Sequence, residues 1–400
     1  MSRSLPITGP LADGRLGAVV LGGDYQGLGI VRSLGRRNIP VLVVDEERSI
    51  AQHSRYATHV TRLDAIGDPA RTPELLLHAA DALQIRGWVL FPTLDETVAL
   101  IARHHDALTE RYRLVTADWD TVRWAWDKRQ TYRLAQDLGI PYPKTWQPQD
   151  VRGLEEVDWA RPVVIKPAIK EHFIYATKAK AWRAESREEL ERLFRKAASI
   201  VGSEEVLVQE LVPGDGRYLL GYCALVRDGV PLATMTTRRW RQHPPDFGRA
   251  STYVETIEDP TVESQSERLL AAIRYTGLVE LEYKVDPVDG SYKLLDFNAR
   301  TWGYHTLGAR AGVDFAALQF AMAVGDHVEP CRARPGVCWV RLLTDTPTAL
   351  VEVYRRRLSV RRYLQSLLAA DTEAVFALDD PLPGLAECFL IPYLVRSRGF

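Results

Sequence analysis

Hard oxygen ligands gather in one predicted hairpin of the 400-residue sequence, between residues 278 and 298. Side chains alternate between the two faces of a strand, so the first strand presents Glu280, Glu282 and Lys284 together. The returning strand presents four side chains on one face: Tyr292, Leu294, Asp296 and Asn298. We therefore expect Glu282, Asp296 and Asn298 to converge, and such oxygen ligands suit Mg²⁺. A solvated charged face is the alternative, but Asp296 lies inside an apolar strand, where an unpaired carboxylate is costly.

Two lysines have positions that suit phosphate binding. Lys166 ends the apolar strand predicted at 161–166, and Lys128 opens a helical stretch after the aromatic residues Trp124 and Trp126. A lysine at the end of an apolar strand often binds phosphate as a point charge. For each lysine, the alternative is a side chain that extends to the surface and is solvated there.

The apolar strand 206–210 leaves through a turn at Pro213 and Gly214. Beyond Glu210 the backbone is expected to offer free donors and acceptors beside apolar side chains, which is what adenine recognition requires. This feature by itself does not identify a nucleotide site.

A glycine-rich turn, residues 22–29, follows the first predicted strand and opens a helix, so its backbone amides are candidates for holding an anion. Its spacing is not the G-x-G-x-x-G of a dinucleotide site. Asp45 nevertheless stands after the second strand, where a ribose-binding acid would lie. A nicotinamide-dependent oxidoreductase is therefore an alternative, and turn geometry alone is a third explanation of the glycines.

Two further charged segments are candidates for contact with the substrate. Residues 238–248, which include Arg241, are too rich in Arg and Pro for a strand and are predicted to form a loop. Asp95 and Glu96 follow a strand at the switch-point side of the first sheet, where a helix-capping role is favoured over a substrate role. Trp302 is expected either to continue along the cleft or to pack in the core.

The elements that position these residues change in style along the chain. From residue 16 to about 117, strands alternate with helices; the strands are 16–21, 41–44, 88–91 and 113–115, and the helices are 26–37 and 95–108. This alternation predicts a doubly wound parallel sheet with ligands at the carboxyl ends of its strands.

A helical connector, 121–138, leads into a region in which neighbouring strands pair through hairpin turns. Its strands are 161–166, 206–210, 218–227, 278–285 and 292–297, with a helix at 186–198. The Asp228-Gly229 pair between apolar runs is a strong hairpin signal. The region is therefore predicted to be α+β. A tail after residue 325 has strand and helix signals at 337–343 and 360–368.

Composition narrows the classes of function. Four hundred residues predict two or three packed units. A formal net charge of −1 argues against a broad surface for nucleic acid or anionic membrane. Four scattered cysteines without a C-x-x-C pair indicate a reducing compartment. With neither a signal-peptide pattern nor an apolar run of membrane-spanning length, a cytoplasmic location is expected.

Together and in order, these residues resemble the ATP-grasp superfamily, and most closely its carboxylate–amine ligase branch, which includes D-aspartate ligase. The resemblance covers about residues 16–325, and it is the order of the motifs that is specific: Lys128, Lys166, Gln209-Glu210, Glu282, Asp296, Asn298 and Arg300. One departure concerns the second metal acid, which is usually Glu in this family and is Asp296 here.

The resemblance implies an ATP-grasp fold with four parts. These are a Rossmann-like N-terminal domain (1–120), a small lid subdomain (121–212), a C-terminal metal and catalytic subdomain (213–330) and a C-terminal extension (331–400). The two α+β subdomains are expected to clamp ATP, and the segment 168–180 is expected to close over the site as a lid.

The resemblance also implies roles for single residues. ATP would be bound by Lys128, Lys166, Gln209, Glu210, Leu211, Val212 and Asp215. Magnesium, with manganese as a possible substitute, would be bound by Glu282, Asp296 and Asn298. Catalysis would depend on Arg300, Lys166 and Arg241. The substrate would meet Gly22, Gly23, Asp95, Glu96, Arg241, Arg300 and Trp302.

The implied function is an ATP-dependent carboxylate–amine ligase that forms an amide or peptide bond through an acyl-phosphate and releases ADP and phosphate. The expected substrates are a small-molecule carboxylate and a small-molecule amine, with amino acids as the default. A homodimer is also possible. A small-molecule kinase of the same fold, the nicotinamide-dependent oxidoreductase and a non-catalytic nucleotide-binding protein are the alternatives.

Overall fold

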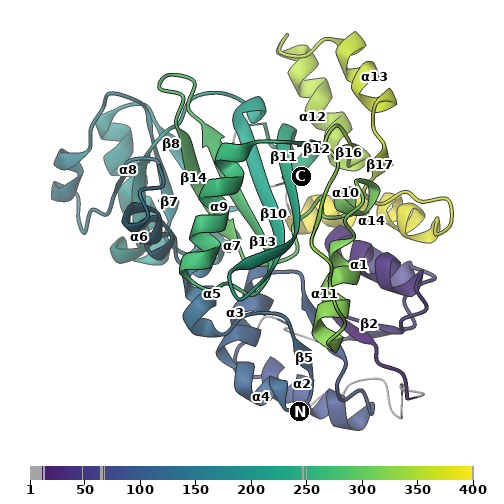
Figure 1. Ribbon diagram of the computed structural model, residues 1–400. Coiled ribbons are helices and arrows are strands. Elements are labelled where there is room, and N and C mark those ends of the chain that lie inside the picture. The colour runs from purple at the N-terminus through teal and green to yellow at the C-terminus, as the bar shows by residue number, and fades with distance from the viewer. Residues whose placement is uncertain are drawn as a thin grey trace.

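The computed structural model describes residues 11, 14–46, 48–63, 66, 68–245, 247–248 and 250–398. Three sheets organise these residues (Figure 1). The N-terminal sheet is parallel, whereas the other two are mostly antiparallel. The prediction of an α/β region followed by α+β regions is confirmed.

The N-terminal sheet runs β3-β2-β1-β4-β5, and all neighbouring strands in it are parallel. Its strands are β1 (Ala18–Leu21), β2 (Val41–Asp45), β3 (His59–Arg62), β4 (Val89–Pro92) and β5 (Arg113–Leu114). The strand order reverses between β1 and β4, which pair Leu21 with Pro92. The turns after these two strands therefore meet at the switch point, where ligands bind in open parallel sheets.

Helices connect these strands: α1 (Tyr25–Gly35), α2 (Thr72–Ala82), α3 (Asp95–Arg103) and α4 (His105–Thr109), with a 3₁₀ turn η1 (Ile50–His53). The helix predicted at 95–108 is thus two helices, because the backbone at His104 leaves the helical region. The strand β3 escapes prediction because it is a half-exposed edge strand without a continuous apolar run.

The smallest sheet has four antiparallel strands in the order β6-β9-β7-β8. They are β6 (Thr145–Trp146), β7 (Val163–Pro167), β8 (Trp182–Ala184) and β9 (Val206–Glu210). The helix α8 (Arg187–Val201) covers it; Ser186 caps the first turn, and Leu190, Leu193, Phe194 and Ala197 form its buried stripe. The predicted lid folds as α7 (Lys170–Thr177) between β7 and β8.

The largest sheet runs β14-β13-β10-β11-β12-β16-β17, with β15 paired to β11. Its long strands are β10 (Leu219–Arg227), β11 (Val230–His243), β12 (Ala250–Ile257), β13 (Gly277–Val285) and β14 (Tyr292–Asn298). The short ones are β15 (Cys331–Arg332), β16 (Cys338–Val340) and β17 (Thr372–Glu373). The helix α9 (Pro260–Ala272) packs on β10 and β11 (Figure 1).

The loop predicted at 238–248 is wrong in its first half, because β11 continues through residue 243 and pairs with β12. Its arginines do not prevent a strand, since their charges are neutralised by partners from other elements. Arg239 forms an ion pair with Glu282, and Arg241 forms one with Asp345.

The predicted connector 121–138 is two helices, α5 (Trp119–Trp126) and α6 (Lys128–Asp137). Asp127 separates them: its backbone is extended and its carboxylate caps α6 by accepting from the amide of Arg129. Val122, Leu134 and other apolar residues of these helices share a core with β10, β13 and β14. The two helices therefore pack with the large sheet, although residues 121–212 are predicted as one lid subdomain.

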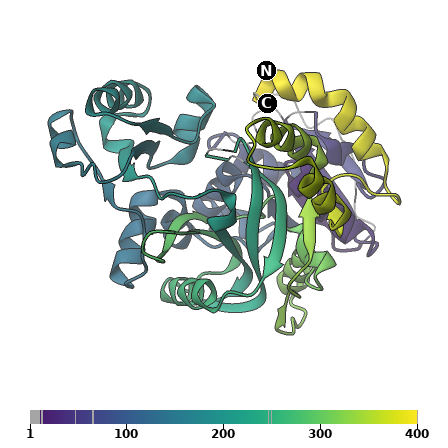
Figure 2. The same cartoon turned by 90° about the horizontal axis from the view of Figure 1, so that it is seen from above.

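The C-terminal residues are part of the same body. β15, β16 and β17 extend the large sheet, so the C-terminal extension predicted at 331–400 adds strands to that sheet. The remaining helices are α10 (Thr306–Arg310), α11 (Phe315–Val324), α12 (Leu342–Tyr354), α13 (Val360–Leu368) and α14 (Leu382–Arg398). The C-terminal segment lies beside the N-terminal region (Figure 2), where Arg32 and Asp380 form a buried ion pair. Among the described residues, no helix is both long and apolar enough to cross a membrane.

Candidate active site

A cavity of about 1540 Å³ lies between the four-stranded sheet and the large sheet. Its walls come from β7, the segment after β9, β13 and β14, and the far end is lined by β11 and by residues of α12 and α13. Many predicted site residues line it: Lys128, Lys166, Gln209, Glu210, Leu211, Val212, Asp215, Arg241, Glu282 and Asp296. Motifs far apart in the sequence therefore share one space.

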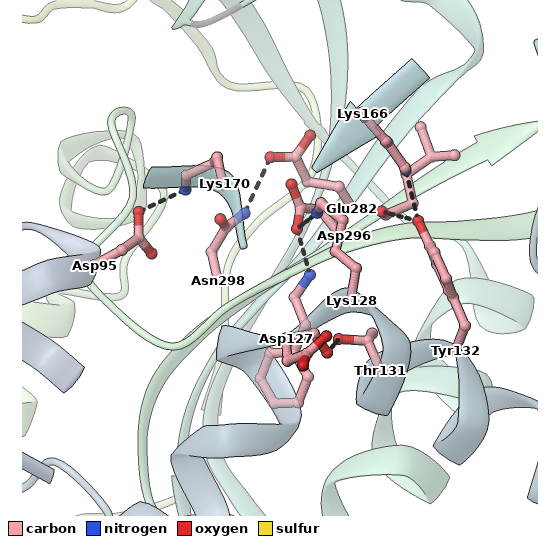
Figure 3. A network of polar contacts seen from close by, with 12 residues as sticks. Asp95, Asp127, Lys128, Thr131, Tyr132, Lys166, Lys170, Glu282, Asp296 and Asn298 are labelled. Atoms are coloured by element: carbon pink, nitrogen blue, oxygen red, sulfur yellow. Dashed lines mark hydrogen bonds and ion pairs between the residues drawn. The ribbon is translucent and has the colours of Figure 1, made fainter. Parts of the chain in front are cut away.

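The predicted metal ligands converge as expected (Figure 3). Glu282 and Asp296 are directly opposed across β13 and β14, and Asn298 donates a 3.0 Å hydrogen bond from Nδ2 to Oε1 of Glu282. These residues offer two carboxylates and one amide, all with hard oxygen atoms. Within the described part of the chain, no group of three or more His, Cys, Asp or Glu side chains is placed to hold a metal ion. The third protein ligand beside Glu282 and Asp296 would therefore be the amide oxygen of Asn298.

The side chains of β14 do not alternate between the two faces of the sheet as regularly as predicted. The pairing register shifts between Glu282 and Tyr283, which leaves Leu295 as an extra residue in β14. Leu294 consequently packs in the core with Phe297, whereas Asp296 lines the cavity. The prediction that Leu294 and Asp296 share a face is wrong, because a bulge changes the alternation.

The charges around the two carboxylates keep them ionised. Burial opposes the ionisation of Asp296, but Lys128 and Lys170 outweigh it and hold the pKa of Asp296 below its usual range. Burial likewise opposes the ionisation of Glu282, but Arg239, whose Nη1 lies 3.1 Å from Oε2 of Glu282, lowers the pKa of that carboxyl. Two ionised carboxylates beside an amide fit a magnesium ion.

Both predicted phosphate lysines lie at this site. Lys128, at the start of α6, forms an ion pair with Asp296 (Figure 3). Lys166 donates a 2.7 Å hydrogen bond to the hydroxyl of Tyr132 and lies over its ring. Burial lowers the pKa of Lys166. A partly buried ammonium whose hydrogen-bond partner is neutral is suited to bind an anionic ligand.

The segment after β9 is less free than predicted. The amide of Glu210 donates to the carbonyl of Lys144, and the amide of Leu211 donates to that of Pro162, so these two backbone donors are occupied. The carboxylate of Glu210 accepts a 2.6 Å hydrogen bond from Lys293. Further along, Val212 and Asp215 line the cavity, and Asp215 pairs with the exposed Arg217.

Asp95 forms ion pairs instead of capping a helix. The N-cap of α3 is Leu94, and Asp95 Oδ2 accepts from Arg300 Nε at 2.9 Å and from Lys170 Nζ at 2.5 Å. The favoured role at the helix start is correct in that both acids lie in the first turn of α3, but the N-cap is Leu94. Glu96 accepts a hydrogen bond from Tyr175 of α7. These contacts link the first turn of α3 to the lid helix and to the end of β14.

Comparisons with known proteins show what the chain is similar to. No family model matches the chain. A D-aspartate ligase from Enterococcus faecium is 26% identical over 223 residues, which are 53% of this chain and 53% of that protein. The chain thus spans about half the length of the curated relative that it matches. An L-amino acid ligase from Bacillus licheniformis superposes with a TM-score of 0.62 at 15% identity, covering 82% of this chain and 79% of its own. The chain has the ATP-grasp fold.

A second solved structure has the same ATP-grasp fold. The biotin carboxylase domain of the Hydrogenobacter thermophilus 2-oxoglutarate carboxylase, a dimer in complex with magnesium ADP and bicarbonate, superposes with a TM-score of 0.62 at 14% identity. The match covers 80% of this chain and 73% of that one. The prediction of the ATP-grasp fold with a Rossmann-like N-terminal part is confirmed.

Two predictions for the substrate side of the site are wrong. Trp302 is fully buried and packs edge-on against Phe315 with ring centroids 4.8 Å apart, so it belongs to the core. The amides of Gly22 and Gly23 do not cradle an anion, because they donate to the carbonyl of Val44 and to the carboxylate of Asp45. Asp45 therefore holds the turn, which also removes the main support for a nicotinamide site.

Close packing explains why the turn needs glycine. At Gly22 the backbone φ is +98°, and a Cβ would lie 2.3 Å from Oγ1 of Thr93; at Gly23 it would lie 2.2 Å from Oγ of Ser49. Arg241 lines the cavity, but its Nε and Nη2 donate to Asp345 at 2.8 and 2.7 Å, and its guanidinium lies over the ring of Tyr253. Arg241 is therefore a fixed residue of the cavity wall.

Several residues of the site were not predicted. They are Tyr132, Lys170, Lys180, Arg239 and Glu280. Glu280 is buried against Asn298 and accepts a 2.5 Å hydrogen bond from Tyr304. Residues 238–243 belong to β11, and Arg239 reaches Glu282 across β10, which lies between β11 and β13. The others depend on contacts between distant segments, for which the sequence carries no local signal.

Proposed function

We propose that this chain is an ADP-forming, ATP-dependent carboxylate–amine ligase. The observation that carries the proposal is the convergence, on one cavity, of Lys128 and Lys166 with the two acids Glu282 and Asp296. This set of residues suits a magnesium nucleotide, because cations meet the phosphates and carboxylates meet the metal. The 26% identity to a D-aspartate ligase supports the choice of an amide-forming reaction.

Glu282, Asp296 and Asn298 would hold Mg²⁺, and Mn²⁺ would be accepted by the same oxygen donors. When bound, the metal would neutralise charge on the phosphate oxygens. Lys128 and Lys166 would bind the phosphates as point charges. The segment Gln209–Val212, with Asp215 at the cavity wall, would border the adenosine. Since two of its amides are already paired, side chains and the remaining backbone groups would make that contact.

Arg300 would act at the transferring phosphoryl group. A substrate carboxylate oxygen attacks the γ-phosphorus, the bond to the β-bridging oxygen breaks, and ADP leaves. An amine then attacks the acyl carbon, phosphate leaves with the former carboxylate oxygen, and the amine gives up a proton. Arg300 donates to Asn298 and forms an ion pair with Asp95. Its positive charge therefore lies beside the predicted metal ligands, where it can stabilise charge on the phosphoryl group.

For the acceptor carboxylate we propose the switch point of the N-terminal sheet. The first turn of α3 reaches Arg300 through Asp95, so a ligand at the ends of β1 and β4 would lie beside the phosphoryl site. Amino acids are the proposed substrates, in line with the relatives named above. The free state of the four cysteines supports a cytoplasmic setting.

We also propose a homodimer built through the C-terminal helices. α12 and α13 present exposed apolar side chains, with Tyr354 89% exposed and Leu368 88% exposed, and α13 buries none of its residues. Large apolar side chains exposed on neighbouring helices are a feature of interaction surfaces. The similar biotin carboxylase domain is a dimer, which supports a second copy as the occupant.

The experiment that tests the proposed function is a screen of amino-acid pairs with Mg-ATP. ADP and inorganic phosphate would be measured, and condensed products would be detected by mass. The proposal predicts equal amounts of ADP, phosphate and amide for the correct pair. A stable phosphorylated substrate without free phosphate would indicate a kinase instead.

A further inference from the structure

The lid segment between β7 and β8, residues 168–181, contains no glycine and brings lysine side chains to the cavity. Most of it folds as α7, whose first residue is Lys170. Lys170 lines the same cavity as Lys128 and Lys166, and Lys180 lines it from the end of the lid. Neither lid lysine has a role in the function proposed above.

Lys170 is held beside Arg300 by a single oxygen atom. Oδ2 of Asp95 accepts from Lys170 Nζ at 2.5 Å and from Arg300 Nε at 2.9 Å. All three side chains are mostly buried, with 17% to 21% of their surface exposed. They come from the lid, from α3 and from the end of β14, so the contact forms only when these three parts of the chain are together.

The position of Lys170 also relates it to the metal carboxylates. Its charge is, after that of Lys128, the largest one that favours the ionised form of Asp296. In Figure 3 the ammonium of Lys170 points toward Asp95. Lys170 therefore stands between the N-terminal domain and the predicted metal site, as Arg300 does.

Lys170 and Arg300 both donate to one oxygen of Asp95, and despite burial nearby carboxylates raise the pKa of each cation, so both remain charged. Glu171 lies 3.4 Å from Lys170, but burial raises the pKa of Glu171 to about 7, so its negative charge is only partly present near neutral pH. An anionic ligand that carries several oxygens would satisfy both cations better than Asp95 alone.

We propose that Lys170 binds the terminal phosphoryl group of a nucleoside triphosphate together with Arg300, and that Asp95 is the counter-ion of both cations in the ligand-free protein. The inference rests on the proposed function, because it presumes that a magnesium nucleotide occupies the cavity. It adds a lid-borne phosphate ligand: closure of α7 brings the cation to the reacting phosphate, which couples lid position to phosphoryl transfer.

The competing explanation is a structural latch. Lys170–Asp95 and Tyr175–Glu96 both tie α7 to the first turn of α3, and that tie alone would account for the ion pair. The two explanations differ in what they predict for Asp95. A latch loses the same contact whichever partner is changed, whereas a phosphate ligand and its counter-ion have opposite effects on nucleotide binding.

The test uses the full chain with Mg²⁺ and compares calorimetric titrations of ADP and of a non-hydrolysable ATP analogue. Lys170→Met should weaken the analogue about 10- to 100-fold and change ADP binding less than about twofold, as expected for one charge-assisted hydrogen bond to the γ-phosphate. Lys170→Arg should restore most of the loss. Asp95→Asn should leave the binding of the analogue unchanged or make it tighter.

Lys178→Asn is the matched control, because Lys178 lies in the same lid at a left-handed position that asparagine tolerates. It should not separate the two nucleotides. Equal weakening of ADP and analogue by both Lys170→Met and Asp95→Asn would establish the latch and overturn the inference. Wild-type protein that binds neither nucleotide would overturn the proposed function, and this inference with it. Normal wild-type binding that Lys170→Met leaves unchanged would overturn the inference alone.

Discussion

Lys128, the first residue of α6, forms an ion pair with Asp296 of β14, 168 residues further along the chain. A predicted phosphate ligand and a predicted metal ligand thus neutralise each other. Pairing of this kind keeps both groups charged in a mostly buried place. A magnesium nucleotide would offer each of them a new partner of the correct sign.

Asp296→Asn should lower ATP turnover at least ~100-fold. Mutating a residue that only hydrogen-bonds to a metal ligand already lowers metal affinity or activity ~10–100-fold, and Asp296 is predicted to be a ligand itself. The melting temperature should stay near that of the wild type. Asp289→Asn, on the exposed turn of the same hairpin, is the control and should remain active. Turnover should require Mg²⁺ or Mn²⁺, and full activity in excess EDTA would contradict the assignment of these ligands.

Lys166→Met should weaken ATP binding by ~1.5–3 kcal/mol, the contribution of a charge-assisted hydrogen bond. Thermal stability should change little, because the substitution removes a single hydrogen bond to a neutral group, the hydroxyl of Tyr132. Binding is measured by calorimetry and stability by thermal melting. Lys196→Met, on α8 of the same subdomain, serves as the control. A variant that melts much earlier but binds ATP normally would show that Lys166 is structural.

Glu280 should make stability depend on pH. Burial, together with the neighbouring Glu282, raises the pKa of Glu280 to about 7, against 4.5 for an ordinary glutamate. Its contribution to stability is therefore fully present below the unfolded pKa and is lost as pH rises through about 7.

Glu280→Gln mimics the protonated acid and does not titrate. Its unfolding free energy relative to the wild type should rise between pH 5 and pH 8 by an amount on the order of 1–3 kcal/mol. Urea unfolding across this range measures the difference, with the exposed Glu258→Gln as a control. A difference that is flat in pH would mean that Glu280 titrates normally.

The double change of Leu364→Glu and Leu368→Glu should convert the proposed dimer to a monomer, because it places charges on the exposed apolar side of α13. Light scattering after gel filtration would give the mass of each species. Val230→Glu, at an exposed position on β11, is the control and should remain dimeric. A wild-type protein that is monomeric at all concentrations would refute the dimer.

Local pattern was sufficient for the parts of the site that one hairpin or one strand end specifies. Glu282 and Asn298 converge because alternation along two paired strands is enough to place them. The same rule failed at Leu294, since a bulge is decided by tertiary packing. Residues 238–243 were assigned to a loop because their composition was considered without the acids that neutralise Arg239.

The substrate side was harder to predict because its contacts are long-range. Asp95 meets Lys170 and Arg300, which are 75 and 205 residues away, and no spacing in the sequence announces such a meeting. Trp302 follows the motif residue Arg300 directly, yet it faces the core. Adjacency in sequence to a site residue therefore does not indicate which way a side chain points.

The central claim is that a substrate carboxylate is activated as an acyl-phosphate, and transfer of ¹⁸O measures it directly. The correct amino acid, labelled with ¹⁸O in its carboxylate, would be incubated with Mg-ATP and the amine, and the phosphate released would be analysed by mass. We predict one ¹⁸O atom in inorganic phosphate for each amide formed, because the attacking carboxylate oxygen leaves with the phosphoryl group. Unlabelled phosphate, or label in AMP with release of pyrophosphate, would contradict the account.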